Sequence, residues 1–286
     1  MTTVADFFKA VSARLDTALG SRSEGDAAAR IIFEDVAGYG RNYLFMNGDR
    51  EITDFMQGKI DAVVAKVAGG EPVQYAVGRA QFMGNDYKVT PAVLVPRPET
   101  AALVDMIISQ WGARTDLDVL DVGTGSGCIA ISLARALPFS RVTALDVSAD
   151  ALDVARENAK ALNVNIDFVR ADIIRVKLPE RPLYNIVVSN PPYVCDSERA
   201  DMDARVLDYE PPVALFVPDS DPLLFYRAIA RYARAALRPG GRLYFEINSR
   251  FPGQTHTLLA GEGFTDIDLQ RDYRGLDRYA SATQPK

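Results

Sequence analysis

The chain has 286 residues, 48% of them hydrophobic and 24% charged, and its formal net charge at pH 7 is −6. This length and composition fit one large globular domain or two smaller ones. The acidic balance disfavours direct binding of nucleic acid, because proteins that bind phosphate backbones usually carry a basic face. The chain has no run of 18 apolar residues and no basic segment leading into an apolar one, so we expect a cytoplasmic protein with no membrane association.

The N-terminal segment is predicted to be helical. Apolar residues recur at helical spacing within residues 3–19, 23–36 and 52–67, which indicates amphipathic helices that bury a common face. A pair of glycines ends the pattern. Because residues 1–70 contain no cofactor motif, we expect them to form a helical bundle that recognises the substrate.

The rest of the chain is predicted to be a hairpin followed by an α/β domain. Apolar and polar residues alternate weakly over residues 71–96 around Gly78 and Gly84, which favours a β-hairpin linker. Strands and helices alternate from Asp118 onwards, a pattern typical of a parallel sheet with helices on both faces. We therefore expect a Rossmann-like domain over residues 97–286.

A glycine-rich turn joins the first strand of this domain to a helix. Its residues are Gly123, Thr124, Gly125, Ser126 and Gly127. Glycines let the backbone turn tightly and let a ligand approach it closely. The order Gly-x-Gly-x-Gly departs from the Gly-x-Gly-x-x-Gly of dinucleotide sites, which makes NAD the weaker of two candidate ligands.

Acidic residues flank this turn. Asp146 closes the next strand 23 residues after Gly123, near the offset at which an acid binds a ribose. Asp121 closes the strand before the turn, where its carboxylate suits an ammonium group. S-adenosylmethionine has no phosphate but offers both a ribose and an ammonium, so it is the favoured ligand.

A third acid, Asp172, closes the following strand. Its carboxylate suits the exocyclic amine of an adenine, with Ile173 packing on the ring; a helix N-cap or plain turn is the alternative. Ligands of open α/β sheets bind outside the carboxyl ends of the strands. The three acids therefore predict one binding site at this edge.

The apolar run 184–189 ends in Asn190, Pro191, Pro192 and Tyr193. Prolines fix φ and remove backbone donors, so this segment is predicted to be a stiff platform with free carbonyl oxygens. Such a platform suits a flat NH2 group, whose hydrogens the Asn190 oxygen and the Pro191 carbonyl accept while the Tyr193 ring packs on its face. A plain turn is the alternative.

Together these motifs resemble class I S-adenosylmethionine methyltransferases that act on a planar nitrogen of adenine, guanine or glutamine. Further segments are similar to the HemK/PrmC family, namely residues 72–78, 82, 93–100, 209–211, 245–247 and 271–273. The resemblance implies methylation of the glutamine amide in the Gly-Gly-Gln tripeptide of peptide chain release factors. We expect the enzyme to be a monomer.

The resemblance also implies site residues. Substrate binding falls to residues 190–193 and Arg97, and catalysis to Asn190, Pro191 and Tyr193. Cofactor contacts fall to Gly123, Thr124, Gly125, Ser126, Gly127, Asp146, Asp172, Ile173 and Asn190, beside the Asp121 suggested by its charge. This chain departs from many relatives at Ala101, where Glu is common, and at Asn248, where Gly is common.

Two other functions stay open. An amino-methyltransferase for adenine or guanine would use the same platform on a flipped base, and a cofactor-binding regulator would catalyse nothing. We expect no metal, because Cys128 and Cys195 lack ligand spacing. We expect no histidine base either, because the only histidine, His256, lies in a polar stretch typical of a solvated helix face.

Residues 194–221 form a long, acid-rich connection after the platform. Long connections without structure of their own are usually functional lids or disordered segments. We expect a lid or wall beside the substrate, with acids that face a basic protein partner.

Overall fold

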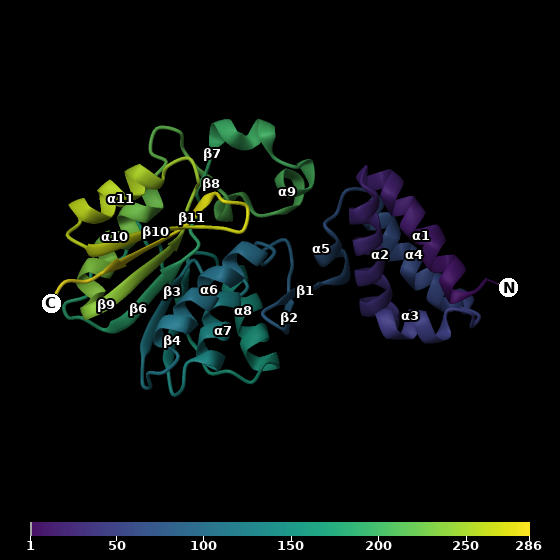
Figure 1. Ribbon diagram of the computed structural model, residues 1–286, viewed down its shortest axis with the longest axis horizontal. Helices are drawn as coiled ribbons and strands as arrows, with labels where there is room; N and C mark the ends of the chain where they lie inside the picture. The colour runs from purple at the N-terminus through teal and green to yellow at the C-terminus, as the bar shows by residue number, and fades with distance from the viewer. Residues whose placement is uncertain (1) are drawn as a thin grey trace. The chain divides into compact units, whose positions relative to one another are not determined.

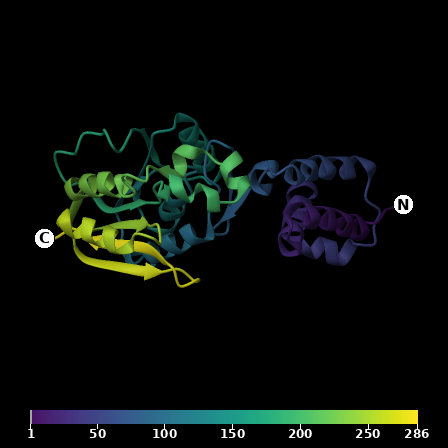
Figure 2. The ribbon, with the colours of Figure 1, turned by 90° about the horizontal axis from the view of Figure 1, so that it is seen from above.

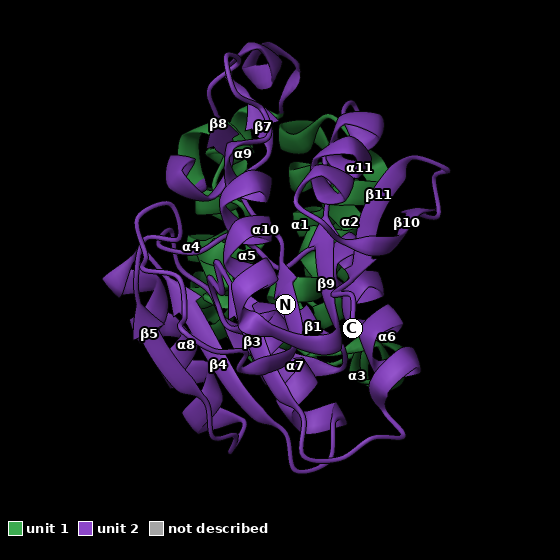
Figure 3. Ribbon diagram, turned by 90° about the vertical axis from the view of Figure 1, so that its left-hand side faces the viewer, with its two compact units in different colours: residues 1–79, 203–209 green, residues 80–202, 210–286 purple. Residues whose placement is uncertain are grey.

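The computed structural model describes residues 2–286, which divide into two compact units (Figure 3). One unit comprises the chain up to Arg79 together with residues 203–209, and the other comprises residues 80–202 and 210–286. Among the described residues, no helix is both long and apolar enough to cross a membrane.

The first unit is a bundle of helices (Figures 1 and 2). They are α1 (Val4–Leu19), α2 (Arg22–Ala37), α3 (Arg41–Asn47), α4 (Asp54–Ala68) and α5 (Val73–Val77). Thr3, Ser21 and Thr53 cap the three long helices, because each side chain accepts a hydrogen bond from the backbone N–H three residues ahead. The three helices predicted from apolar spacing are confirmed. Helices α3 and α5 were not expected, because five to seven residues hold too few turns for a periodic pattern.

The core of this bundle comes from α1, α2 and α4, with Leu15, Ile32 and Ile60 fully buried. Helix α9 (Ala204–Tyr209) also belongs to the unit. Arg205 of α9 forms an ion pair of 3.0 Å with Glu24 of α2. The buried side chains of α1, α2 and α4 give the bundle a hydrophobic core of its own.

A short hairpin opens the second unit. Its strands are β1 (Arg79–Phe82) and β2 (Asn85–Lys88). The turn residues Met83 and Gly84 both have positive φ, 47° and 72°, as two-residue hairpin turns with the twist of the strands require. The predicted hairpin is present but shorter than expected, because residues 73–77 form α5 instead.

The second unit is built on a seven-stranded sheet in the order β10-β11-β9-β6-β3-β4-β5. The strands from β9 to β5 are parallel, and β10 and β11 form an antiparallel edge. Their bounds are β3 (Asp118–Val122), β4 (Arg141–Asp146), β5 (Asp167–Arg170), β6 (Tyr184–Ser189), β9 (Leu237–Glu246), β10 (Thr265–Arg271) and β11 (Asp277–Thr283). The predicted Rossmann-like sheet is confirmed.

Helices cover both faces of this sheet (Figure 1). On one face lie α6 (Pro98–Trp111), α7 (Cys128–Ala136) and α8 (Ala149–Ala161), and on the other lie α10 (Leu224–Ala236) and α11 (Pro252–Gly261). Successive strand residues point to opposite faces. Val119 accordingly packs with Leu103 of α6, and Leu120 packs with Ile229 of α10.

The parallel register brings four strand ends together. Val122 of β3 pairs with Leu145 of β4 and with Ser189 of β6, and Asp146 pairs with Arg170 of β5. The residues that follow these strands therefore meet at one edge of the sheet.

The connection over residues 194–221 has secondary structure of its own, and its expected role as a lid or wall beside the substrate stays a prediction. It contains β7 (Val194–Cys195), the 3-10 helices Asp196–Asp201 and Pro212–Ala214, α9, and β8 (Phe216–Val217), which pairs with β7. Most of its acids have local partners: Asp196 pairs with Arg199, Asp203 with Arg205, and Asp221 with Arg227. These ion pairs are local, and the expectation that acids of this connection face a basic protein partner stays a prediction.

Candidate active site

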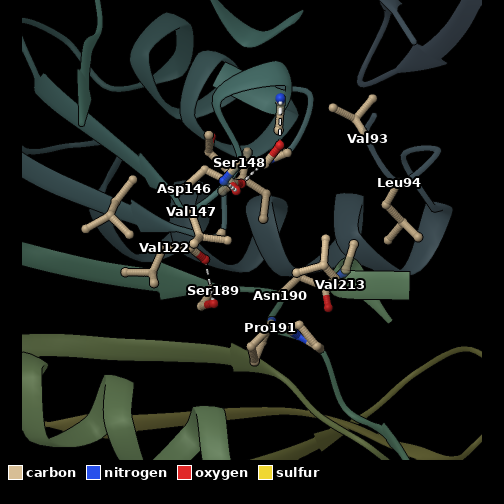
Figure 4. Close-up of a pocket in the computed structure, with 18 of the residues that line it drawn as sticks. Val93, Leu94, Val122, Asp146, Val147, Ser148, Ser189, Asn190, Pro191 and Val213 are labelled. Atoms are coloured by element: carbon tan, nitrogen blue, oxygen red, sulfur yellow. Dashed lines mark hydrogen bonds between the residues drawn. The ribbon is translucent and has the colours of Figure 1, made fainter. Parts of the chain in front are cut away.

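A cavity of about 290 Å³ lies at the carboxyl edge of the parallel strands. Figure 4 shows its wall, with Asp146 at the end of β4, Ser148 just after it, and Asn190 and Pro191 after β6. The volume is near the lower end of the range of roughly 300–1,000 Å³ for small-molecule sites. The cavity is therefore where the strand-end motifs predicted a site.

The glycine turn forms one side of this cavity. Gly123, Gly125 and Gly127 have φ of 75°, 54° and 80°, in the left-handed region that favours glycine. A Cβ on Gly123 or Gly125 would meet no atom within 4 Å, so the missing side chains leave room for a ligand at the backbone. A Cβ on Gly127 would come within 3.2 Å of Ala155 in α8, so this glycine serves helix packing instead.

The structure places Asp121 beneath the glycine turn rather than on the cavity wall. Its Oδ2 accepts hydrogen bonds from the Thr124 hydroxyl at 2.7 Å and from the Ala130 N–H at 3.2 Å. Its Oδ1 is buried and has no hydrogen-bond partner among residues 2–286. Burial raises the pKa of Asp121 to about 7. A nearby cation would stabilise the ionised carboxylate.

We expect Asp121→Asn to stabilise the ligand-free protein at alkaline pH. The asparagine oxygen can keep both hydrogen bonds of Oδ2, and a neutral amide avoids burying an unpaired charge. The folded-state pKa lies above the unfolded value near 3.9. Protonation therefore contributes stability below pH ~4, and the wild-type protein loses that stability as pH rises to ~7.

Urea denaturation at two pH values checks this expectation. The free energy of unfolding of the variant minus that of the wild type should be larger at pH 8 than at pH 5 by about 1–3 kcal/mol. An equal difference at both pH values would show that Asp121 is not an unfavourably buried carboxylate.

Asp146 lines the cavity and holds the glycine turn in place. Its Oδ2 accepts from the Gly125 N–H and its Oδ1 from the Ser148 N–H, each at 2.9 Å. Each carboxylate oxygen has a further lone pair, so both can also accept from a pair of hydroxyls. Burial raises the pKa of this carboxyl.

Asp172 and Ile173 line the cavity after β5. Asp172 Oδ1 accepts from the Ile174 N–H at 3.0 Å, and Oδ2 lies 3.4 Å from Arg175 Nε. Asp172 thus stabilises a turn, as the alternative interpretation held, while it also contributes to the cavity wall.

The segment after β6 keeps two acceptors at the cavity. Asn190, Pro191 and Pro192 line it. The Asn190 Nδ2 donates to Oγ1 of Thr100 at 3.1 Å, which leaves Asn190 Oδ1 for another donor. No backbone N–H of the described chain donates to the Pro191 carbonyl oxygen. Free acceptors at these positions are compatible with the predicted amide-binding platform.

Tyr193, in contrast, does not lie on the cavity wall. Its hydroxyl donates to Glu246 Oε1 of β9 at 3.0 Å, and its ring packs in the cluster beside α10. The Asn248 Nδ2 donates to the Tyr193 carbonyl oxygen at 2.9 Å. The packing of the Tyr193 ring on a substrate amide stays a prediction. In the structure, Tyr193 anchors the platform to β9, and Asn248 adds a second anchor.

Arg97 lines the cavity, but its charge is already neutralised. Its guanidinium pairs with Glu210, whose side chain is only 1% exposed. Removing one partner of such a pair leaves a buried charge, which is strongly destabilising. Arg97 therefore holds the segment after α9 beside the cavity.

Most residues of the apolar cavity wall were not predicted from the sequence. Val93 and Leu94 come from the loop before α6, Val213 from a 3-10 helix, and Phe225 and Ile229 from α10. Loop residues show no periodic pattern, and those of α10 look like ordinary core residues. Thr100 and the buried Glu246 behind it were also missed as site residues.

Neither cysteine is prepared to act as a nucleophile. Both are buried, and burial raises the pKa of Cys128 to about 12 and that of Cys195 to about 11. His256 is exposed on α11, as expected. Within residues 2–286, no group of three or more His, Cys, Asp and Glu is placed to hold a metal ion.

The cavity suits S-adenosylmethionine. The Asp146 carboxylate fits ribose hydroxyls, and Ile173 and its apolar neighbours fit an adenine ring. A doubly covered parallel sheet with this cavity at its carboxyl edge defines a class I S-adenosylmethionine-dependent methyltransferase.

Comparison with known proteins narrows the class. Residues 6–78 match the PrmC N-terminal domain and residues 99–208 the Methyltransferase small domain. The chain is 41% identical to the release factor glutamine methyltransferase of Bacteroides thetaiotaomicron, over 91% of this chain and 93% of that protein. It is 40% identical to the protein of that name from Chlorobaculum tepidum, over 88% and 87%.

A solved methyltransferase from Pyrococcus furiosus shares the fold, with a TM-score of 0.52 at 17% identity over 78% of this chain and 98% of that one. The full-length relatives show more than the fold. The chain belongs to the HemK/PrmC family of release factor glutamine methyltransferases, which confirms the resemblance seen in its motifs.

Proposed function

We propose that this enzyme methylates the side-chain amide nitrogen of the glutamine in the Gly-Gly-Gln tripeptide of peptide chain release factors. The observation that carries the proposal is the end of β6. There Asn190 and Pro191 line a cavity, and the Asn190 Oδ1 and the Pro191 carbonyl oxygen accept no hydrogen bond from the described residues. Two adjacent acceptors match the two hydrogens of a carboxamide NH2 group. The relatives named for this reaction support the same substrate.

The cofactor is held, in this proposal, by the glycine turn and the strand-end acids. The backbone at Gly123 and Gly125 leaves room for the amino-acid part of the cofactor, with the carboxylate of Asp121 below the turn as the charge that favours its ammonium. Asp146 accepts from the ribose, and Asp172 with Ile173 borders the adenine. When bound, S-adenosylmethionine supplies a methyl group activated by its sulfonium.

The task of the protein is placement and charge stabilisation. A carboxamide nitrogen is a poor nucleophile, since its lone pair is delocalised into the carbonyl. Asn190 and Pro191 grip both N–H groups, orient the nitrogen at the ~3–3.5 Å separation of a near-attack geometry, and stabilise the positive charge that develops on it. The proton can then leave to water, so no strong base is required.

The helical bundle is proposed to recognise the protein substrate. It has its own core, and every residue of the cavity belongs to the other unit. Release factors act in translation, so we propose that the enzyme works in the cytoplasm, and as a monomer.

Deleting residues 1–78 is expected to separate recognition from cofactor binding. Affinity for S-adenosylhomocysteine should stay within about threefold of the full chain, because the cavity is untouched, while kcat/KM for an intact release factor should fall at least about tenfold. Calorimetry and a methyl-incorporation assay measure the two effects. Activity on a free Gly-Gly-Gln peptide is the control, and an undiminished kcat/KM for the intact factor would refute a recognition role.

Mass spectrometry tests the proposed reaction itself. The enzyme, S-adenosylmethionine and a release factor should yield one added methyl on the glutamine amide, and replacing that glutamine should eliminate the product. A tripeptide with two glycines can enter a narrow cavity, whereas a duplex base must first be flipped at a cost of a few kcal/mol. Methyl incorporation into RNA or DNA, with none into the release factor, would instead establish a nucleic-acid amino-methyltransferase.

A further inference from the structure

A buried chain of hydrogen bonds links Asn190 to β9. The Asn190 Nδ2 donates to Oγ1 of Thr100 at 3.1 Å, and the Thr100 hydroxyl donates to Oε2 of Glu246 at 2.7 Å. Thr100 lies in the first turn of α6, and its exposed fraction and that of Glu246 are both 2%. Water therefore has little access to either link.

The chemistry of Asn190, Thr100 and Glu246 determines which group donates and which accepts in each of these two hydrogen bonds. With Glu246 ionised, as the hydrogen bonds from Thr100 and Tyr193 and the charge of Arg278 favour, its carboxylate can only accept, so the single hydrogen of the Thr100 hydroxyl points to Glu246. The Thr100 oxygen is then left as an acceptor and requires a donor. Only the NH2 end of the Asn190 amide can meet that need, and the amide must therefore turn its carbonyl oxygen toward the cavity.

We propose that Thr100 and Glu246 are positioning residues, which fix the Asn190 side chain with its carbonyl oxygen facing the substrate amide. The proposal rests on the function proposed above, in which that oxygen grips an N–H of the substrate. If the Asn190 amide were flipped, it would present NH2 to the substrate NH2, and the two donors would repel each other.

Neighbouring groups keep the Glu246 carboxylate in the position that this role requires. Its second oxygen, Oε1, accepts from the Tyr193 hydroxyl at 3.0 Å. Burial raises the pKa of Glu246, while the hydrogen bonds from Thr100 and Tyr193 and the charge of nearby Arg278 oppose that rise. Tyr193 thus contributes to catalysis from behind the platform, by fixing the carboxylate that fixes Thr100.

Thr100→Val and Thr100→Ser test the proposal with full-length enzyme. Valine has the shape of threonine without the hydroxyl, so Asn190 loses its acceptor and can flip. We expect kcat for a Gly-Gly-Gln peptide to fall about 10- to 100-fold, with the affinity for S-adenosylhomocysteine within about twofold. Serine restores the hydroxyl and should recover kcat to within about threefold of wild type.

Thr255→Val is the matched control. Thr255 is fully buried in α11 of the same unit, and its hydroxyl donates to the Phe251 carbonyl at 2.9 Å, outside the cavity. The Thr255→Val variant measures how much kcat falls when a buried threonine hydroxyl is lost outside the site. A Thr100→Val variant that keeps kcat within about twofold of this control, or a loss that serine does not recover, overturns the proposal.

Hydrogen exchange of the Asn190 side-chain amide gives a readout that does not depend on turnover. In nitrogen-15 NMR spectra, Asn190→Asp identifies the NH2 signal by its disappearance. We expect that signal to exchange with water at least about tenfold faster in Thr100→Val than in wild type and in Thr255→Val. Equal exchange in all three proteins overturns the proposed orientation. A wild-type enzyme that fails to methylate an intact release factor instead overturns the proposed function, and the exchange experiment still decides the role of Thr100.

Discussion

Asn190→Ala is expected to lower kcat for a Gly-Gly-Gln peptide by about 100- to 10,000-fold, while the affinity for S-adenosylhomocysteine changes less than about threefold. The side chain is held by Thr100, and its Oδ1 is left free at the cavity. Its grip on the substrate nitrogen strengthens as positive charge develops there. Removing it therefore raises the barrier of the chemical step more than it weakens ground-state binding.

Single-turnover kinetics with saturating cofactor measures kcat for this variant, and calorimetry measures cofactor binding. Asn165→Ala is a matched control, because Asn165 is an exposed asparagine of the same unit outside the cavity. Equal and large losses of cofactor affinity and of kcat would make Asn190 mainly a cofactor ligand. The Pro191 carbonyl would then be the only substrate acceptor on the platform.

The location of the site could be predicted from the sequence because parallel strands share an edge. Asp146, Asp172 and Asn190 each follow an apolar run, and the register of β3 to β6 brings those three positions to one cavity. The positive φ of the glycine turn is likewise a local requirement that only glycine meets without strain. Features of this kind depend on a few neighbouring residues and one rule of sheet geometry.

The direction of individual side chains could not be predicted in the same way. Tyr193 adjoins the platform in sequence, yet its hydroxyl is bound by Glu246, 53 residues later. Thr100 reaches Glu246 across 146 residues. Such contacts arise from the packing of α6 and β9 against β6, which no periodic pattern records. The motif therefore predicted the segment but not the contacts that its tyrosine makes with β9.

The hydrogen bonding of Asp121 is a second feature that the sequence motifs could not predict. Its charge suited an ammonium group, but the sequence could not show that one oxygen would hold Thr124 and Ala130 while the other stayed unpaired. Burial of an unpaired carboxylate oxygen costs stability in the ligand-free protein. If the ammonium of the cofactor binds as proposed, its charge offsets that cost.

Asp146→Ala is expected to weaken binding of S-adenosylhomocysteine by on the order of 1.5–3 kcal/mol, which is roughly 10- to 150-fold. Two losses combine in this variant. The ribose loses a charged acceptor, and Gly125 and Ser148 lose the carboxylate that receives their N–H groups. The glycine turn is then less well ordered before the ligand arrives.

Calorimetry on Asp146→Ala, Asp146→Asn and Asp150→Ala separates these losses. Asp150 is an exposed acid of α8 outside the cavity, so Asp150→Ala removes one negative charge and should leave the affinity within about twofold. Asparagine at 146 can still accept with one oxygen, and its affinity should fall between those of the alanine variant and the wild type. An affinity of Asp146→Ala equal to that of Asp150→Ala would remove Asp146 from the binding site. It would also undermine the assignment of the other strand-end residues, because they share one edge of the sheet with it.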